Sequence, residues 1–239
     1  MSAPGPMLFL DFDGTMTQRD ATDAILEAFA DPTWLDVERA WLAGSIGSRD
    51  CMRAQIDLVS ASPAHVDALL DGIDLDPGLS MLLDASAAFG VPLHIVSDGF
   101  DYCIRRILGR PDRGLSHRIA ESQIFSSGLE PVRSNRWRAT FSHPPDPCAH
   151  GCATCKPAVI ERLSGGACLV VFVGDGLSDR HAAACADVVF AKDKLAAYCD
   201  HASIPYTPFD TLASVTEGLA RLMHDGMHRT VSRKVAPAL

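Results

Sequence analysis

The sequence lacks long hydrophobic runs and any excess of positive charge. The longest uninterrupted apolar stretch covers only residues 167–173, whereas a helix needs about 20 apolar residues to cross a bilayer. The chain carries 30 Asp and Glu residues against 21 Lys and Arg residues, a formal net charge of -9. This balance argues against nucleic acid and against a membrane surface as partners.

The sequence also lacks an internal repeat, and its N-terminus has no basic leader and no long apolar region, so we expect no secretory signal. Its eight cysteines then indicate reduced thiols in a cytoplasm rather than a disulfide framework. With 239 residues, 47% of them hydrophobic, the chain can bury a sizeable core as one domain, or as one domain with a small insert. We expect a monomer or a homodimer.

What the sequence does contain is an alternation of short apolar runs and amphipathic helices. Strands are predicted over residues 7–10, 91–96, 169–173 and 188–191, and a pair of strands over 124–130 and 137–141. Helices are predicted between most of them, and the tail after residue 226 is expected to fray. This alternation predicts an α/β fold, a Rossmann-like parallel sheet with right-handed connections.

A different pattern lies between the first two strands. Four short amphipathic helices are predicted there, begun by Asp20, Asp31-Pro32, Ser48 and Ser62-Pro63, and Asp76-Pro77 begins the helix after them. Such a helical bundle predicts a cap domain over residues 17–75, inserted in a core domain of residues 1–16 and 76–239. We expect the cap to cover the carboxyl ends of the strands.

The first strand ends in Asp11-Phe12-Asp13-Gly14-Thr15. Side chains two apart on an extended chain point the same way, so Asp11 and Asp13 lie side by side at the carboxyl end of a parallel strand. One carboxylate could attack phosphorus while the other moves a proton. Gly14 permits a sharp turn, and Thr15 offers its hydroxyl and N–H to an anion. The alternative is an ordinary turn with capping aspartates.

Later strand ends and helix starts add polar groups in a fixed order. Ser97-Asp98-Gly99 follows the second strand, where a hydroxyl and free N–H groups suit a phosphate oxygen. Lys156 begins a helix and can supply a cation. Asp175 and Asp179 follow the next strand, and acidic oxygens there suit Mg²⁺. Each alone reads as a loop or surface residue, and their order favours a site.

This ordered set resembles the four motifs of the haloacid dehalogenase superfamily. The resemblance implies that Asp11 is a nucleophile that forms an aspartyl-phosphate, and that Asp13 protonates the leaving alcohol and then activates water. It also implies that Ser97 and Lys156 neutralise the phosphoryl group. The protein would then be a phosphomonoesterase that acts on a small phosphate ester.

The same resemblance implies a bound Mg²⁺. Asp11, Asp175 and the backbone carbonyl of Asp13 would hold it, with Asp179 in support.

The helical insert resembles the cap of the phosphoserine-phosphatase branch of this superfamily. The stretch from Cys148 to Pro157 resembles the Cys-rich approach to the motif lysine in methionine-salvage phosphatases, which act on 2-hydroxy-3-keto-5-methylthiopentenyl-1-phosphate. Two positions depart from the branch: Asp98 stands where it often has Gly, and Asp20 where phosphoserine phosphatases carry Glu. Arg53 falls where those enzymes place a carboxylate-binding arginine. Residues near Asp20, Asp23 and Arg53 are the expected contacts for the organic part of the substrate.

Three functions therefore compete with a methionine-salvage phosphatase: a phosphoserine phosphatase, a dehalogenase, and a non-catalytic binding protein with the same fold. Asp13 and Asp175 argue against a dehalogenase, which needs neither. The spacing of Cys148, Cys152 and Cys155, with two histidines nearby, is also typical of zinc ligands. Only one Cys-x₂-Cys half-site is present, so a structural zinc and a cluster of packed thiols both remain open.

Overall fold

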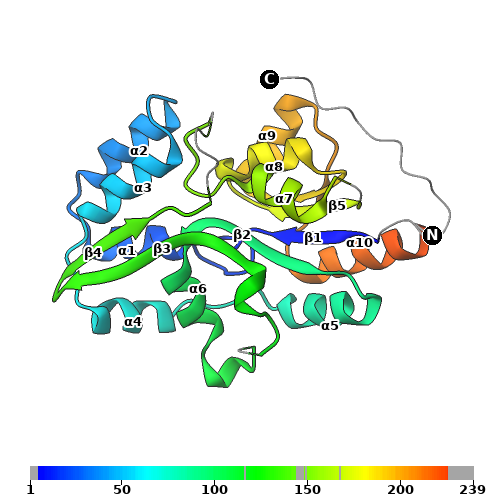
Figure 1. The fold of residues 1–239 in the computed structure, drawn as a ribbon, viewed down its shortest axis with the longest axis horizontal. Coiled ribbons are helices and arrows are strands. Elements are labelled where there is room, and N and C mark those ends of the chain that lie inside the picture. Colours follow the sequence, from blue (N-terminus) through cyan, green and yellow to red (C-terminus); the bar gives the residue numbers. More distant parts are fainter. Residues whose placement is uncertain (1–4, 116, 144–147, 149, 167, 226–239) are drawn as a thin grey trace.

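The computed structural model describes residues 5–115, 117–143, 148, 150–166 and 168–225. The tail after residue 226, for which we expect fraying, lies outside them. A seven-stranded sheet runs through the described chain in the order β4-β3-β2-β1-β5-β6-β7 (Figure 1). All neighbouring strands are parallel except β3 and β4. The α/β sheet is confirmed. Its strands are β1 (Met7–Leu10), β2 (Leu93–Phe100), β3 (Ile124–Arg133), β4 (Arg136–Thr140), β5 (Val170–Gly174), β6 (Val188–Ala191) and β7 (Thr207–Pro208).

The central strand β1 is buried on both faces. Leu8 lies opposite Leu93 of β2 and Val171 of β5, and its side chain joins the larger hydrophobic core. Phe9 points the other way, into the second core. This alternation explains why β1 is apolar at every position, and it delivers the chain after Leu10 to the middle of the sheet's carboxyl edge.

Helices cover both faces of the sheet (Figure 1). On one face lie α7 (Lys156–Ser164), α8 (Arg180–Cys185) and α9 (Asp193–Ala202). On the other lie α5 (Leu79–Phe89), α6 (Asp101–Leu108) and α10 (Leu212–Asp225). Helix α9 was not predicted from the sequence. No helix within the described residues combines the length and the apolar character needed to span a membrane.

The insert consists of α1 (Ala21–Phe29), α2 (Trp34–Leu42), α3 (Ser48–Asp57) and α4 (Pro63–Asp71). The chain leaves and re-enters the core at neighbouring points, because Thr17 and Leu75 form an isolated antiparallel bridge. We propose a division into a core of residues 1–16 and 76–239 and a cap of residues 17–75 on this ground. The β3–β4 hairpin also supports the insert: Trp137 Nε1 donates to the Ala61 carbonyl at 2.8 Å, and β4 contacts α3.

The predicted helix starts are right at some positions and shifted at others. Ser62 caps α4 as expected, since its hydroxyl accepts from the His65 N–H. Asp31 instead accepts from the N–H and hydroxyl of Thr33, so α2 begins at Trp34, two residues after the predicted start at Pro32. Asp76 accepts from Gly78 N–H at 2.8 Å and Leu212 N–H at 3.0 Å, and therefore ties α5 to α10 rather than capping either helix.

Candidate active site

A cavity of about 510 Å³ lies at the carboxyl edge of the sheet, beneath the insert. Most of the site residues predicted from the sequence meet in this cavity, although they come from four separate segments of the chain. The predicted residues that line it are Asp11, Asp13, Asp20, Ser97, Asp98, Gly99 and Asp175. Lys156 and Asp179 are almost fully buried, and both pair with groups of this site.

Asp11 follows β1 and is held through one oxygen. Its Oδ1 accepts from the Phe12 N–H at 2.8 Å and lies 3.0 Å from Lys156 Nζ. Among the described residues, no hydrogen bond is made to Oδ2. A carboxylate fixed at one oxygen and free at the other suits nucleophilic attack, because its orientation is set before substrate binds.

Asp13 lies beside it in a tight pocket. Its Oδ1 accepts from the Ala21 N–H at 2.8 Å, at the start of α1. A Cβ on Gly99 would lie 2.1 Å from its Oδ2, so only glycine leaves room for this carboxyl. Burial, and next the charge of Asp20, raise the pKa of Asp13 well above its ordinary value. The shift favours the protonated form of Asp13, which is the form that can donate a proton.

Lys156 is the first residue of α7 and lies among carboxylates. Its Nζ is 2.5 Å from Asp179 Oδ1 and 3.0 Å from Asp11 Oδ1. Burial favours the neutral amine, but Asp11, Asp179 and Asp98 outweigh it and hold the pKa of Lys156 above its ordinary range. The lysine thus stays charged inside the protein.

Asp179 bonds to Lys156 and to the backbone of the loop after β5. Its Oδ2 accepts from the N–H groups of Asp175 and Gly176, both at 3.1 Å, while its Oδ1 meets Lys156. Both oxygens of Asp179 are therefore occupied, and the residue fixes the loop after β5.

Asp175 is fixed by a threonine. The Thr15 hydroxyl donates to Asp175 Oδ1 at 2.6 Å, and the Thr15 N–H goes to the Phe12 carbonyl. Both Thr15 groups thus have partners within the protein, and Thr15 is not among the residues that line the cavity; its predicted contact with an anion stays a prediction. Burial and the charge of Asp11 raise the pKa of Asp175 to about 6.

Asp11, Asp175 and Asp179 bring carboxylate oxygens within 4.8 Å of one another. Gly14, at φ +74°, passes so close that a Cβ there would lie 2.4 Å from Asp175 Oδ2. These donors are all hard oxygens, the ligand type that Mg²⁺ prefers. The residues present therefore fit the predicted metal.

The Ser97-Asp98-Gly99 segment differs from expectation in detail. It lies inside β2, which continues to Phe100 through a shift of register against β3. The Gly99 N–H donates to Ser97 Oγ at 3.0 Å, so that N–H is not available to a ligand. Ser97 accepts in this bond and keeps its own O–H proton for another group.

Asp98 lines the cavity, but its side chain bonds within the protein. It accepts from the Ser48 hydroxyl of α3 at 2.8 Å and from the Thr154 N–H at 3.2 Å. A half-buried carboxylate with two donors does not favour phosphate, so the predicted contact of this segment with phosphate rests on the Ser97 hydroxyl and the remaining backbone N–H groups and stays a prediction. Asp98 instead joins the insert to the loop before α7.

Arg53 lies away from the cavity. Its guanidinium pairs with Asp50 at 3.0 Å and stands 5.1 Å over the Phe141 ring. The neighbouring positions Cys51, Met52 and Gln55 of α3 line the cavity instead. One step along a helix turns a side chain by about 100°, so a residue adjacent to the lining positions can face solvent.

Asp20 does line the cavity. Its side chain caps α1 by accepting from the Asp23 N–H at 2.9 Å. Burial, and next the charge of Asp23, raise the pKa of Asp20 to about 7.

A family model described as haloacid dehalogenase-like hydrolase matches residues 8–184. The chain belongs to this family. It is 32% identical over 219 residues to the 2-hydroxy-3-keto-5-methylthiopentenyl-1-phosphate phosphatase of Geobacillus thermodenitrificans, covering 90% of this chain and 96% of the relative. The phosphatase of the same name from Geobacillus kaustophilus is also 32% identical, with the same coverage. The prediction of a phosphatase is confirmed.

The fold of this haloacid dehalogenase-like hydrolase is also that of solved structures. One of them, a phospho-aspartyl intermediate analogue of phosphoserine phosphatase, superposes with a TM-score of 0.67 at 16% identity, covering 89% of this chain and 97% of that one. The likeness supports the predicted Rossmann-like core with a helical insert.

The sequence reasoning missed several lining residues. Glu38 and Trp41 come from α2, Met52 and Gln55 from α3, and Lys194 from α9. The segment before Lys194 follows β6 at the carboxyl edge of the sheet, where such folds place their ligands, and that signal could have found it. No comparable signal marks the α2 and α3 residues, because the packing of the insert decides which of its faces meets the cavity.

Proposed function

We propose that this hydrolase is a Mg²⁺-dependent phosphomonoesterase that works through an aspartyl-phosphate on Asp11. The observation that carries the proposal is one cavity that brings together Asp11, held by Lys156, with Asp13 and Asp175, and burial raises the pKa of Asp13 toward the form that can donate a proton. Asp11 and Asp175, with the backbone carbonyl of Asp13, would hold the ion. When bound, Mg²⁺ supplies positive charge against the phosphoryl oxygens.

The chain's own residues account for both halves of the reaction. In the first, Asp11 Oδ2 attacks phosphorus, the ester P–O bond breaks, and Asp13 gives its proton to the leaving alkoxide. In the second, the Asp13 carboxylate takes a proton from water as that water attacks the aspartyl-phosphate. The P–O bond to Asp11 breaks, phosphate leaves, and both carboxyls return to their starting states.

Two further groups would stabilise the negative charge of the transferred phosphoryl group. Lys156 carries a charge that burial does not remove, and the Ser97 hydroxyl retains a proton to donate. Both act by charge stabilisation, the main catalytic contribution in phosphoryl transfer.

For the substrate, we propose 2-hydroxy-3-keto-5-methylthiopentenyl-1-phosphate. The named relatives support it, and Trp41, Cys51 and Met52 give the insert side of the cavity apolar and sulfur surfaces for a thioether tail. Phosphoserine is the second candidate because Asp20, Asp23 and Glu38 could receive an amine. Its carboxylate has no arginine partner among the described lining residues, since Arg53 lies elsewhere, and this disfavours it.

Two measurements test the proposal in turn. Hydrolysis of an aryl phosphate should require Mg²⁺ and stop with a chelator. Beryllium fluoride with Mg²⁺ should then place a phosphate mimic on Asp11, and density on any other residue would refute the nucleophile. A steady-state comparison of the enolised keto phosphate with phosphoserine decides the substrate. A clear preference for phosphoserine would overturn the substrate proposal and leave the phosphatase intact.

A further inference from the structure

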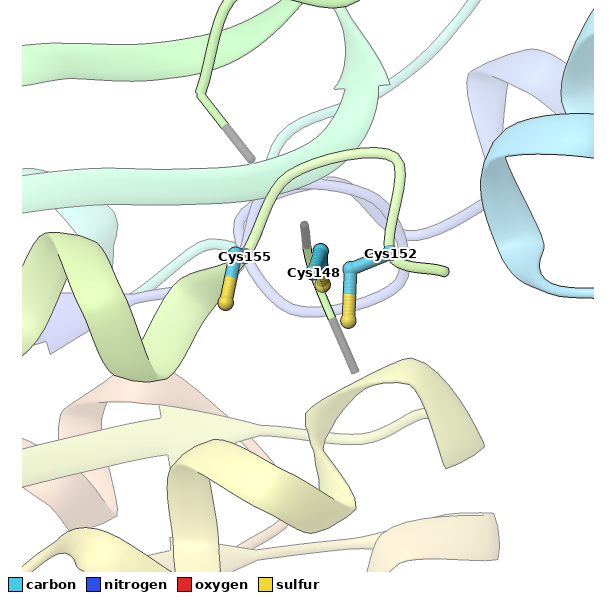
Figure 2. A group of neighbouring side chains, drawn as sticks. All are labelled: Cys148, Cys152 and Cys155. Carbon is cyan, nitrogen blue, oxygen red and sulfur yellow. The ribbon is translucent and has the colours of Figure 1, made fainter. Parts of the chain in front are cut away.

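A second cluster of ligand-type side chains lies outside the cavity. The sulfurs of Cys148, Cys152 and Cys155 all lie within 4.8 Å of one another, and all three residues are free thiols. Figure 2 shows Cys148 between the other two, with Cys155 at the start of α7 and Cys152 on the loop before it. Closeness in sequence does not by itself bring three sulfurs together. The conformation of the loop before α7 places them side by side.

We propose that Cys148, Cys152 and Cys155 bind one zinc ion. Zinc takes thiolates at about 2.3 Å in a tetrahedral arrangement, which puts the sulfurs about 3.8 Å apart, within the spacing of this cluster. The donors are all soft sulfur, whereas the group formed by Asp11, Asp175 and Asp179 is all hard oxygen. The chain thus offers two chemically distinct sites that select different metals.

The described part of the chain supplies three ligands. No fourth His, Cys, Asp or Glu among the described residues joins the group within 4.8 Å. Cys148 and Cys152 are only half-buried, so water can reach the cluster and complete the tetrahedron.

The loop that carries these cysteines also supports the site. The Arg49 N–H donates to the Gly151 carbonyl at 3.0 Å, and Arg49 Nε donates to the Cys152 carbonyl at 3.1 Å. The Ala153 N–H donates to Ser48 Oγ at 2.9 Å. The start of α3 therefore rests on this loop.

Lys156 directly follows Cys155, so the same loop also holds the catalytic cation. A zinc ion there would fix the loop from which both α3 and Lys156 are positioned. The proposal does not depend on the phosphatase mechanism, because zinc binding is measured without turnover.

The test uses the full chain purified with reductant and loaded with zinc in the presence of excess Mg²⁺. We expect about one equivalent of zinc by elemental analysis, and cobalt(II) in its place should give the visible bands and near-ultraviolet thiolate charge transfer of a tetrahedral sulfur site. Zinc removal should lower the melting temperature. Zinc-free protein that takes up no cobalt into a thiolate site, or a disulfide within the cluster of the reduced preparation, would overturn the proposal.

Variants locate the ion. Cys152→Ser should bind less than about a fifth of an equivalent, and Cys152→His, which restores a ligand, should bind zinc again. Cys185→Ser removes an exposed thiol of α8 outside the cluster and should retain the full equivalent. Asp175→Asn should also retain it, and zinc lost in Asp175→Asn but kept in Cys152→Ser would place the ion at the carboxylates and refute the proposal. If Cys152→Ser does not fold, the cobalt spectrum of the unmodified chain still decides.

Discussion

The two walls of the cavity are built in different ways. On the core wall, Asp11, Lys156 and Asp179 are almost fully buried and bonded to one another. The insert wall is formed mainly by α2 and α3. Helix α2 has no fully buried residue, whereas Cys51, Met52 and Gln55 of α3 are buried but, unlike the core wall, hold no charge. A buried charge cluster tolerates little change, because removing one partner leaves another charge unpaired, at a cost of about 3–5 kcal/mol. We therefore expect substitutions on the core wall to affect the chemical step, and substitutions on the insert wall to affect which substrate binds.

The largest effect should come from the core wall. Asp11→Asn removes the nucleophile and should lower kcat by about 10⁴-fold or more, because a neutral amide of the same shape does not form the ester with phosphorus. The measurement is aryl phosphate hydrolysis with Mg²⁺, with circular dichroism to show that the fold is kept.

The matched control is Asp84→Asn, which changes an exposed aspartate of α5 that pairs with Arg118. It should retain activity within about twofold, as surface substitutions usually do. Near-normal turnover by Asp11→Asn would remove the basis of the proposed mechanism.

The next largest effect should come from a glycine on the same wall. Gly99→Ala adds a Cβ that would lie 2.1 Å from Asp13 Oδ2, and the Ala21 N–H holds the other oxygen of Asp13 in place. The carboxyl must shift, and a shift of about 1 Å at a catalytic group can cost about 10²-fold in kcat. Alcohol leaving groups should suffer more than aryl ones, since they need the proton.

Gly176→Ala is the comparison for this change. Gly176 also lines the cavity, but the atom nearest to its added Cβ would be 3.5 Å away, so we expect less than a twofold loss. An equal loss of kcat in Gly99→Ala and Gly176→Ala would show that the position of the Asp13 carboxyl does not depend on the absence of a Cβ at Gly99.

The sequence was sufficient for much of the core wall, and the reason is geometric. Parallel strands bring their carboxyl ends to one edge, so Asp11, Ser97 and Asp175 could be expected to meet. Their partners could not be read in this way. Thr15 binds Asp175, and Asp98 binds Ser48 and Thr154, because both choices depend on loops that meet only in the folded chain.

The insert wall could be predicted only as four helices. Amphipathic spacing gives α1 to α4, but it does not say which face of α3 meets the core. Ser48, expected to cap α3, lies on its first turn and bonds to Asp98 instead. Arg53 was expected in the cleft and lies on Phe141. The orientation of α3 is set by the loop before α7 and by β4, far away in sequence.

A smaller effect is therefore expected on the insert wall. Trp41→Ala removes aromatic surface from the cavity and should raise KM for the proposed substrate about tenfold with little change in kcat, because about 1.4 kcal/mol of binding is lost. Arg53→Met should leave KM within about twofold, since the guanidinium pairs with Asp50 outside the cavity. A large rise in KM for Arg53→Met alone would reverse the assignment of these two positions.

The last expected effect concerns stability rather than activity, at the border between the walls. Asp20 has a pKa raised to about 7, by burial first and then by Asp23. The folded state therefore binds this proton more tightly than the unfolded state. The resulting stabilisation is complete below about pH 4 and is lost as the pH rises through about 7.

In metal-free protein, the free energy of unfolding should thus fall between pH 5 and pH 7, with at most about 2 kcal/mol of the fall due to Asp20. In urea unfolding of Asp20→Asn, the free energy of unfolding should fall less steeply with pH, because the amide does not titrate and still caps α1. The part of the fall that remains would come from Asp13 and Asp175, whose pKa values are also raised. Asp31→Asn is the control. The pKa of Asp31 is lowered by hydrogen bonds from the side chain and backbone of Thr33, so its linkage lies below pH 4 and the fall should match that of the unmodified chain. If the free energy of unfolding of Asp20→Asn falls with pH as steeply as that of the unmodified chain, the Asp20 carboxyl is hydrated in the folded protein. Asp20 would then belong to the insert wall rather than to the buried core wall.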